Sequence, residues 1–149
     1  MNAEKLLKLL KENRVKFVII GTTAFPVHGY SRATLDIDIL IKPDQMNAKR
    51  TRKALKQFGY DVTDLTVEEL LTKKVLIRQY RVETDIHPNV KGATFEKIWK
   101  NKVKAKLGQT FAWFASLDDL IKMKRAASRT QDLEDLKYLL QLKKRYRKR

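Results

Sequence analysis

Two aspartates separated by one residue, Asp36 and Asp38, are the strongest indication of chemistry in the sequence. They lie in the apolar run LDIDILI, which predicts a strand over 35–41, and residues two apart on a strand project from one face. Two carboxylates so close repel each other unless a cation or a shared proton relieves them. With no Cys or His in the run, the pair favours a hard divalent ion, Mg²⁺ or Mn²⁺. The alternative is a solvated strand face with two incidental acids.

A third carboxylate, Asp85, lies in an alternating segment that predicts a strand over 82–87. Alternation places Asp85 on the polar face of that strand. If the two acid-bearing strands are neighbours, Asp85 joins Asp36 and Asp38 as a third metal ligand. His87, two residues further along the same face, would then lie near this group.

A turn suited to phosphate precedes the aspartates. Gly21, Thr22 and Thr23 follow a buried strand predicted over 15–20 and begin a short helix predicted over 22–29. A helix N-terminus offers free amides, glycine lets a phosphate approach the backbone, and threonine hydroxyls add donors. The sequence thus predicts a phosphate site beside a divalent-metal site. The alternative is an ordinary strand-to-helix turn in which these residues only cap the helix.

The composition excludes several other kinds of site. The chain has 149 residues, no Cys and two His, which rules out disulfides, thiolate zinc sites, a cysteine nucleophile and a His-rich metal cluster. No apolar run approaches the roughly 20 residues of a membrane span. The start MNAEKLLKLLKENR lacks the apolar core of a signal peptide. We therefore expect a soluble, cytoplasmic protein with no membrane partner.

The chain is strongly basic, with a formal net charge of +16 from 33 Lys and Arg against 17 Asp and Glu. The last seven residues, 143–149, carry six positive charges, and removing them leaves +10. A field of this sign attracts phosphate-rich partners. Surface ion pairs of a thermophilic protein would explain many charges but not this excess. Like charges also crowd one expected helix, where a solvated face is the default and a phosphate partner the alternative: Lys49, Arg50, Arg52, Lys53 and Lys56.

The order of elements predicts one α+β (α/β mixed) domain over 1–142 and a basic C-terminal tail over 143–149. Besides the strands named above, we expect strands over 75–80, 103–107 and 110–115. We expect helices ending near Asn13, over 44–58, 66–72 and 95–100, and beginning at Ser116 and Thr130.

Three further expectations concern packing. The apolar residues of the last helix predict one buried face, with the basic tail frayed beyond it: Leu133, Leu136, Tyr138, Leu139, Leu140 and Leu142. Four aromatic residues are expected in the core: Trp99, Phe111, Trp113 and Phe114. His28 is expected to pack or cap rather than to bind a ligand.

Two motifs resemble those of the polymerase-beta-like nucleotidyltransferase superfamily. The segment VIIGTTAFPVHGYSRATLDIDIL (18–40) is similar to its core, where a Gly-Gly or Gly-Ser turn precedes Arg-x-Thr-x-Asp-x-Asp. The segment SLDDLIKMKRAASRTQDLEDL (116–136) resembles the C-terminal signature of the AbiEii-type and minimal nucleotidyltransferases of toxin–antitoxin systems. The resemblance spans 15–140 and implies a mixed central sheet with flanking helices and a C-terminal helical segment.

The resemblance implies a role for each matching residue. Asp36 and Asp38 would hold Mg²⁺, and Asp85 would be a further metal ligand that orients and deprotonates the acceptor hydroxyl. Lys124 would be catalytic. The implied nucleotide-binding residues are Gly21, Thr22, Thr23, Arg32, Arg129 and Asp132. The chain departs from the pattern at Thr22, which stands where the family has Gly or Ser and adds a methyl group where the phosphate must pass.

We therefore expect Mg²⁺-dependent transfer of a nucleoside monophosphate from an NTP to a hydroxyl. The acceptor would be RNA, such as a tRNA 3′ end, or a partner protein, within a toxin–antitoxin or defence pair. The alternative is a degenerate relative that binds nucleotide or nucleic acid as an antitoxin or regulator, which Thr22 favours. A plain basic nucleic-acid-binding protein would leave Asp36 and Asp38 unexplained, because acids in a phosphate-binding groove oppose binding.

Overall fold

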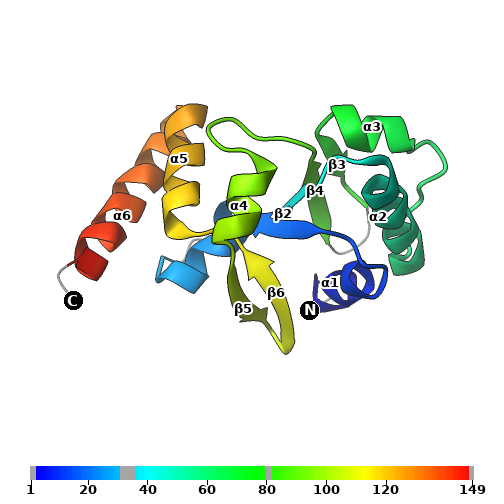
Figure 1. The fold of residues 1–149 in the computed structure, drawn as a ribbon, viewed down its shortest axis with the longest axis horizontal. Coiled ribbons are helices and arrows are strands. Elements are labelled where there is room, and N and C mark those ends of the chain that lie inside the picture. The colour runs from blue at the N-terminus through cyan, green and yellow to red at the C-terminus, as the bar shows by residue number, and fades with distance from the viewer. Residues whose placement is uncertain (1–2, 31–35, 80–81, 148–149) are drawn as a thin grey trace.

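The computed structural model describes residues 3–30, 36–79 and 82–147 of the chain (Figure 1). Arg32 and Leu35, which carried expectations above, lie outside these residues. The helices are α1 (Ala3–Glu12), the 3₁₀ helix η1 (Gly21–His28), α2 (Gln45–Phe58), α3 (Val67–Thr72), α4 (Phe95–Asn101), α5 (Leu117–Ala127) and α6 (Thr130–Arg147). The strands are β1 (Phe17–Ile20), β2 (Asp36–Ile41), β3 (Val75–Ile77), β4 (Glu83–His87), β5 (Val103–Leu107) and β6 (Thr110–Phe114). The predicted α+β class is confirmed.

The described strands form one mixed sheet in the order β3-β4-β2-β1-β6-β5. β2 is parallel to β4 and β1 to β6, while the other neighbours are antiparallel. Ile19 pairs with both Ile39 and Phe114, and Ile39 pairs with Ile86. Paired residues share a face, so these apolar side chains define one face of the sheet. The aspartates of β2 and β4 lie on the opposite face.

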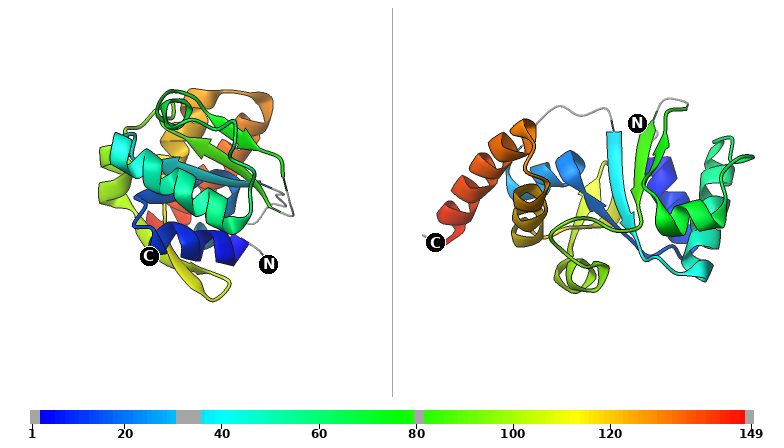
Figure 2. Two further views of the ribbon diagram at one scale, coloured as in Figure 1. Left: turned by 90° about the vertical axis from the view of Figure 1, so that its right-hand side faces the viewer. Right: turned by 90° about the horizontal axis from the view of Figure 1, so that it is seen from above.

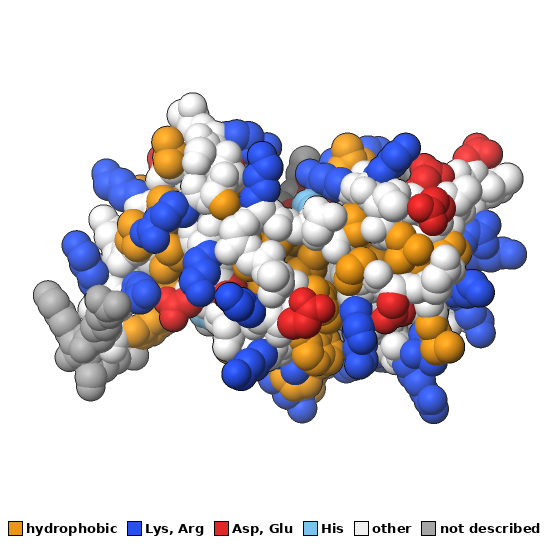
Figure 3. Space-filling view, turned by 45° about the horizontal axis from the view of Figure 1, so that its top comes forward, with side chains coloured by type: hydrophobic (Ala, Val, Ile, Leu, Met, Phe, Trp, Pro, Cys, Tyr) orange, Lys and Arg blue, Asp and Glu red, His pale blue; other side chains and the backbone are white. Residues whose placement is uncertain are grey.

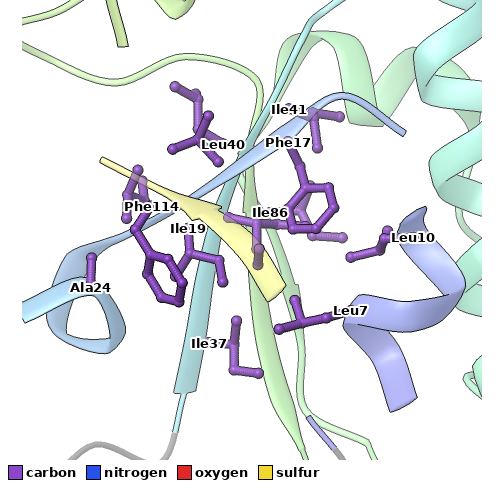
Figure 4. Close-up of a cluster of buried hydrophobic side chains, with 14 of the residues drawn as sticks. Leu7, Leu10, Phe17, Ile19, Ala24, Ile37, Leu40, Ile41, Ile86 and Phe114 are labelled. Carbon is purple, nitrogen blue, oxygen red and sulfur yellow. The ribbon is translucent and has the colours of Figure 1, made fainter. Parts of the chain in front are cut away.

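Helices cover both faces of the sheet. α1, α2 and α3 lie on one side, and η1, α5 and α6 lie on the other (Figure 2). Buried apolar residues lie on both sides of the sheet. On the first side, Leu7 and Leu10 of α1 pack near Phe17, Ile37 and Ile86, which belong to the face opposite the aspartates (Figure 4). The second layer therefore faces the aspartates. Among the described helices, none combines the length and the apolar character needed to cross a membrane.

Local signals set the helix ends as expected. Asp44 caps α2 by accepting a hydrogen bond from the backbone N–H of Asn47 at 2.7 Å. Ser116 caps α5 by accepting one from the N–H of Asp119 at 3.2 Å. Such caps satisfy amides that have no partner within the helix. β3 ends at Ile77 and is shorter than the predicted strand.

The short helix expected over 22–29 is η1, which contains Pro26 and ends where Gly29 adopts a φ of 97°. His28 is buried near this end, with Nε2 2.8 Å from the carbonyl oxygen of Ala115. The expected packing role of His28 is confirmed.

The expectation of one buried apolar face on α6 holds for Leu136, Leu139, Leu140 and Leu142, which are buried or half-buried, but is wrong for the other two residues. Leu133 and Tyr138 are 52% and 44% exposed, whereas Asp132 and Asp135 are buried. An apolar pattern does not reveal such positions, because an acid can be buried when a cation pairs with it, and here Lys124 contacts both acids.

The expected fraying of the basic tail is also wrong, because α6 continues to Arg147. Lys143 Nζ lies 2.8 Å from Oδ1 of Asp118. The hydroxyl of Tyr146 donates to the carbonyl oxygen of His28 at 2.7 Å. These contacts hold the last turns of α6 against α5 and η1.

Two of the four aromatic residues expected in the core are exposed. Phe114 is buried and Trp99 is half-buried, but Phe111 and Trp113 are 44% and 37% exposed. Because side chains alternate along β6, residues 112 and 114 face the core and 111 and 113 face outward.

Candidate active site

The acids of β2 and β4 lie side by side. In the parallel register Asp38 pairs with Asp85, and Asp36 pairs with Glu83. Side chains of such neighbours leave the same face of the sheet. Asp85 is buried, while the side chains of Asp36 and Asp38 are 34% and 23% exposed. The structure thus meets the condition on which the third carboxylate depended.

The turn after β1 lies against these acids. Gly21 has a φ of 66°, and a β-carbon placed on it would lie 2.9 Å from Oδ2 of Asp38. The hydroxyl of Thr23 donates to the carbonyl oxygen of Asp36 at 3.0 Å. Thr22 is buried within the same turn. A glycine is required here both for its conformation and for its lack of a side chain.

An arginine that the sequence analysis did not single out contacts three of the acids. Arg78 donates from Nη1 to Oδ1 of Asp85 at 2.6 Å. Its Nη2 lies 3.8 Å from Oδ2 of Asp36, and its Nε lies 3.7 Å from Oε2 of Glu83. Lys74 Nζ lies 3.9 Å from the other oxygen of Asp85. The only sequence signal was the position of Arg78 directly after a strand paired with the acid-bearing β4.

The protonation of these groups reflects their crowding. A hydrogen bond with Asp36, and the negative charge of that neighbour, raise the pKa of Glu83 above its usual value. The hydrogen bond to Asp85, with the charges of Asp36 and Glu83, raises the pKa of Arg78. The crowded carboxylates therefore attract the positive charge of arginine.

His87 joins the same cluster from β4. Its Nε2 lies 2.8 Å from Oδ1 of Asp38, so the two side chains are hydrogen-bonded. His87 lies on the polar face of its strand, as the alternation predicts. Asp38 thus has a histidine partner, while Asp85 has an arginine partner.

The donor set suits a hard divalent ion, although its present arrangement is not a formed metal centre. Within the described residues, no group of three or more His, Asp and Glu side chains is placed to hold a metal ion. Carboxylate oxygens are the ligands that Mg²⁺ prefers, and the contacts of Arg78 show that these oxygens accept a cation. Asp36, Asp38 and Asp85 are the residues that would hold Mg²⁺ after exchanging arginine for metal.

A second cluster joins α5 to α6. Lys124 Nζ lies 3.0 Å from Oδ1 of Asp132 and 3.2 Å from Oδ2 of Asp135. Arg129 donates from Nε to the other oxygen of Asp132 at 2.7 Å. Tyr30 donates to Asp135 at 3.1 Å. The structure therefore brings Lys124, Arg129 and Asp132 together. Asp135 was missed, although it follows Asp132 by three residues on one helix face.

Charge links the two clusters. Burial raises the pKa of Asp132, but hydrogen bonds from Arg129 and Lys124 outweigh this effect and bring it to about 2. The pKa of Arg129 is raised mainly by its hydrogen bond to Asp132 and in small part by the charge of Asp38. Arg129, whose side chain is 80% exposed, therefore lies within electrostatic range of the acids on the sheet.

The basic residues of α2 lie away from both clusters. Arg52 donates to the carbonyl oxygens of Leu65 and Val62 at 2.8 and 3.0 Å, so it holds the loop before α3. Lys49 and Lys53 are exposed on the far side of the sheet from the aspartates. On the face drawn in Figure 3, Lys and Arg side chains are spread widely rather than gathered at one place.

Comparison with known proteins decides the family. A family model described as "Nucleotidyltransferase of unknown function (DUF6036)" matches residues 1–144. The chain belongs to this nucleotidyltransferase family. The match includes the Gly21 turn, the aspartates of β2 and β4 and the Lys124–Asp132 cluster, so all lie within the nucleotidyltransferase domain. No curated protein matches the chain.

Proposed function

We propose that the protein transfers a nucleoside monophosphate from an NTP to a hydroxyl group of RNA, such as a tRNA 3′ end, or of a partner protein. The pairing of Asp38 with Asp85 beside Gly21 carries this proposal. It sets two carboxylates next to a turn whose backbone a phosphate can approach. Membership of a nucleotidyltransferase family supports the same reaction class.

The residues of the site divide the work of such a transfer. Asp36 and Asp38 supply oxygen ligands, and Mg²⁺, when bound, stabilises the charge of the triphosphate and of the leaving pyrophosphate. Asp85 orients the acceptor hydroxyl and takes its proton, after releasing the hydrogen bond from Arg78. The hydroxyl oxygen bonds to the α-phosphorus as the bond to pyrophosphate breaks in line. Positioning and charge stabilisation supply most of the acceleration.

The second cluster pairs two cations, Lys124 and Arg129, with two carboxylates, Asp132 and Asp135, beside the acids of the sheet. Arg129 is largely exposed and so can reach a phosphate, while Lys124 is held in place by Asp132 and Asp135. We assign nucleotide binding to Arg129 and Lys124, and we assign to Asp132 the positioning of these two side chains. Thr22, Thr23 and Arg32 are assigned to the phosphates on the basis of the family motif.

A second candidate function is binding without chemistry. The contacts of Arg78 with Asp85, Asp36 and Glu83 favour it, because this guanidinium holds the oxygens that a metal ion needs. Thr22 also favours this second function, because its methyl group lies where the phosphate must pass. Such a protein would bind nucleotide or nucleic acid as an antitoxin or regulator. Either function fits an AbiEii-type protein of a toxin–antitoxin or defence pair.

A labelling assay separates the two. The native protein is incubated with each of the four α-³²P-labelled NTPs, Mg²⁺ and either total RNA or a protein extract. We expect label on one acceptor class, its loss in Asp36→Asn with Asp38→Asn, and its retention in Asp64→Asn, which alters an exposed acid outside the site. Nucleotide binding without labelling would support the second candidate. The absence of both would overturn the proposal.

A further inference from the structure

The β5–β6 hairpin presents aromatic and basic side chains on one outward face. In its register Lys104 pairs with Trp113 and Lys106 pairs with Phe111. All four side chains therefore leave the same face of the hairpin, and all four are exposed. Hydrophobic side chains reach the surface at the lower centre of Figure 3, in the region of this hairpin, with Lys and Arg side chains around them.

The rings and ammonium groups of this face are interleaved. Lys102 Nζ lies 4.0 Å from the ring centroid of Trp99 and 4.6 Å from that of Trp113. Lys104 and Lys106 lie 4.9 and 5.0 Å from the centroid of Phe111. Cation–π contacts hold each ammonium group near a ring. We call these six residues the hairpin face.

A hollow adjoins the hairpin face. Its volume is about 410 Å³, and its lining includes Lys11, Phe17, Trp99, Lys104, Phe111 and Trp113. A volume of about 300–1,000 Å³ is typical of pockets for small organic groups. Among the described residues that line it, none is acidic. The hollow is thus apolar in its walls and positive at its rim.

We propose that the hairpin face binds a single-stranded segment of RNA. RNA is one of the two acceptor classes of the proposed function, and in that respect the proposal rests on that function. Bases would stack on Trp113 and Phe111, and the lysines would contact the flanking phosphates. Exposed aromatic residues beside a line of positive charge are typical of surfaces that bind unpaired nucleotides, since every base offers a ring face for stacking.

Two features weigh against a protein partner. A purely apolar partner would leave Lys102, Lys104 and Lys106 without compensation. Addition of a strand along the edge strand β5 is opposed by its exposed lysines, because charged side chains on an edge discourage such pairing. RNA satisfies the rings and the charges together.

The aromatic residues of the hairpin lie on the side of the sheet that carries the acids. Trp113 alternates with Phe114, and Phe114 shares its side of the sheet with Ile19 and Ile39. Trp113 therefore lies on the same side of the sheet as Asp38. An RNA strand stacked on Trp113 therefore lies on the side of the acids, whereas Lys11 and Phe17 of the hollow belong to the side that α1 covers.

Tryptophan fluorescence offers a direct test, because the chain has two tryptophans and both belong to the hairpin face. Titration of the full-length protein with a 12-nucleotide oligouridine should quench this fluorescence. Polyphosphate, which carries charge but no bases, should not. An RNA duplex should bind more weakly than the single strand, because its bases are already stacked.

Variants then separate stacking from charge. By anisotropy of a labelled oligouridine, Trp113→Ala and Phe111→Ala should each lower affinity about tenfold without changing the salt dependence. Lys104→Gln with Lys106→Gln should flatten the slope of log affinity against log salt by about 1.4. The matched controls are Leu76→Ala, an apolar residue 54% exposed on β3, and Lys49→Gln with Lys53→Gln on α2. Thermal melts check that every variant is folded.

Several results would overturn this proposal. They are unchanged affinity in both aromatic variants, equal quenching by polyphosphate, or stronger quenching by an acidic peptide than by RNA. The test is separate from that of the proposed function, because it measures RNA affinity and tryptophan quenching, whereas the labelling assay measures transfer. Binding at the hairpin without labelling of either RNA or protein would refute the transferase alone. Labelling of RNA with unchanged affinity in the hairpin variants would refute the hairpin proposal alone.

Discussion

Asp38 of β2 and Asp85 of β4 are direct neighbours in a parallel pair of strands, and each has a different basic partner. Asp38 is partly exposed and bonded to His87, whereas Asp85 is buried and bonded to Arg78. The same oxygens that accept these bonds are those that a metal ion would need. A metal ion bound there would therefore compete with the contacts of Arg78.

Replacement of Arg78 should reveal this competition. In Arg78→Gln we expect Mn²⁺ and Mg²⁺ to bind more tightly, by up to about tenfold, because the guanidinium no longer occupies Asp85, Asp36 and Glu83. Calorimetric titration with each metal measures this. Arg125→Gln, which removes an exposed arginine of α5, is the control and should leave metal affinity unchanged. Weaker or unchanged metal binding in Arg78→Gln would show that Arg78 is not a competitor.

Alanine at Gly21 should damage the site more than the fold. Gly21 and Gly29 both have positive φ, at 66° and 97°, so alanine at either position should destabilise the protein by about 1–2 kcal/mol. Only at Gly21 would the new β-carbon meet the Asp38 carboxylate, at 2.9 Å; at Gly29 the nearest atom is 3.6 Å away. We expect more than tenfold loss of NTP affinity in Gly21→Ala and little in Gly29→Ala. Equal losses of affinity would contradict the position of the turn.

Asp132 should stabilise the fold in a pH-dependent way. Its pKa is about 2 in the folded protein against an ordinary 3.8, so its contribution is full above pH 3.8 and is lost as the pH falls towards 2. The difference corresponds to about 2 kcal/mol. Urea unfolding at pH 7 should show Asp132→Asn destabilised by about this amount, and by less at pH 3. Asp64→Asn, at an exposed acid outside both clusters, should change stability by less than about 0.5 kcal/mol at both. A loss for Asp132→Asn that is equal at pH 7 and pH 3 would contradict the assigned pKa.

The basic end of α6 should act through charge, while Tyr146 acts through structure. Deletion of 143–149 removes both, since Tyr146 bonds to the carbonyl oxygen of His28. Lys144→Gln with Arg145→Gln should instead flatten the salt slope of RNA binding by about 1.4 and leave the melting temperature unchanged. Tyr146→Phe should lower stability by about 1 kcal/mol without altering the slope. An unchanged salt slope in Lys144→Gln with Arg145→Gln would show that these two residues do not contact RNA.

Features that depend on a few adjacent residues could be predicted from the sequence. The helices that begin near Asp44, Thr66 and Ser116 and the two adjacent strands around 108–109 are set by local residues, and all lie where expected. The shared face of Asp36 and Asp38 also follows from alternation alone.

Features that depend on distant residues could not be predicted. Arg78 reaches Asp36 from another strand, and nothing near either residue in the chain indicates their contact. The burial of Asp135 depends on Lys124 of the preceding helix. The exposure of Trp113 depends on which face of the hairpin the rest of the chain covers. In each case the decisive partner is set by tertiary packing.

Nucleotide affinity with and without metal tests the central claim most directly. Calorimetry should show that Mg²⁺ strengthens NTP binding to the native protein, and that Asp36→Asn with Asp38→Asn abolishes this gain. The variant should melt at the same or a higher temperature, because two crowded charges are removed. Equal NTP affinity of the native protein with and without Mg²⁺ would contradict a metal-assisted nucleotide site at these aspartates.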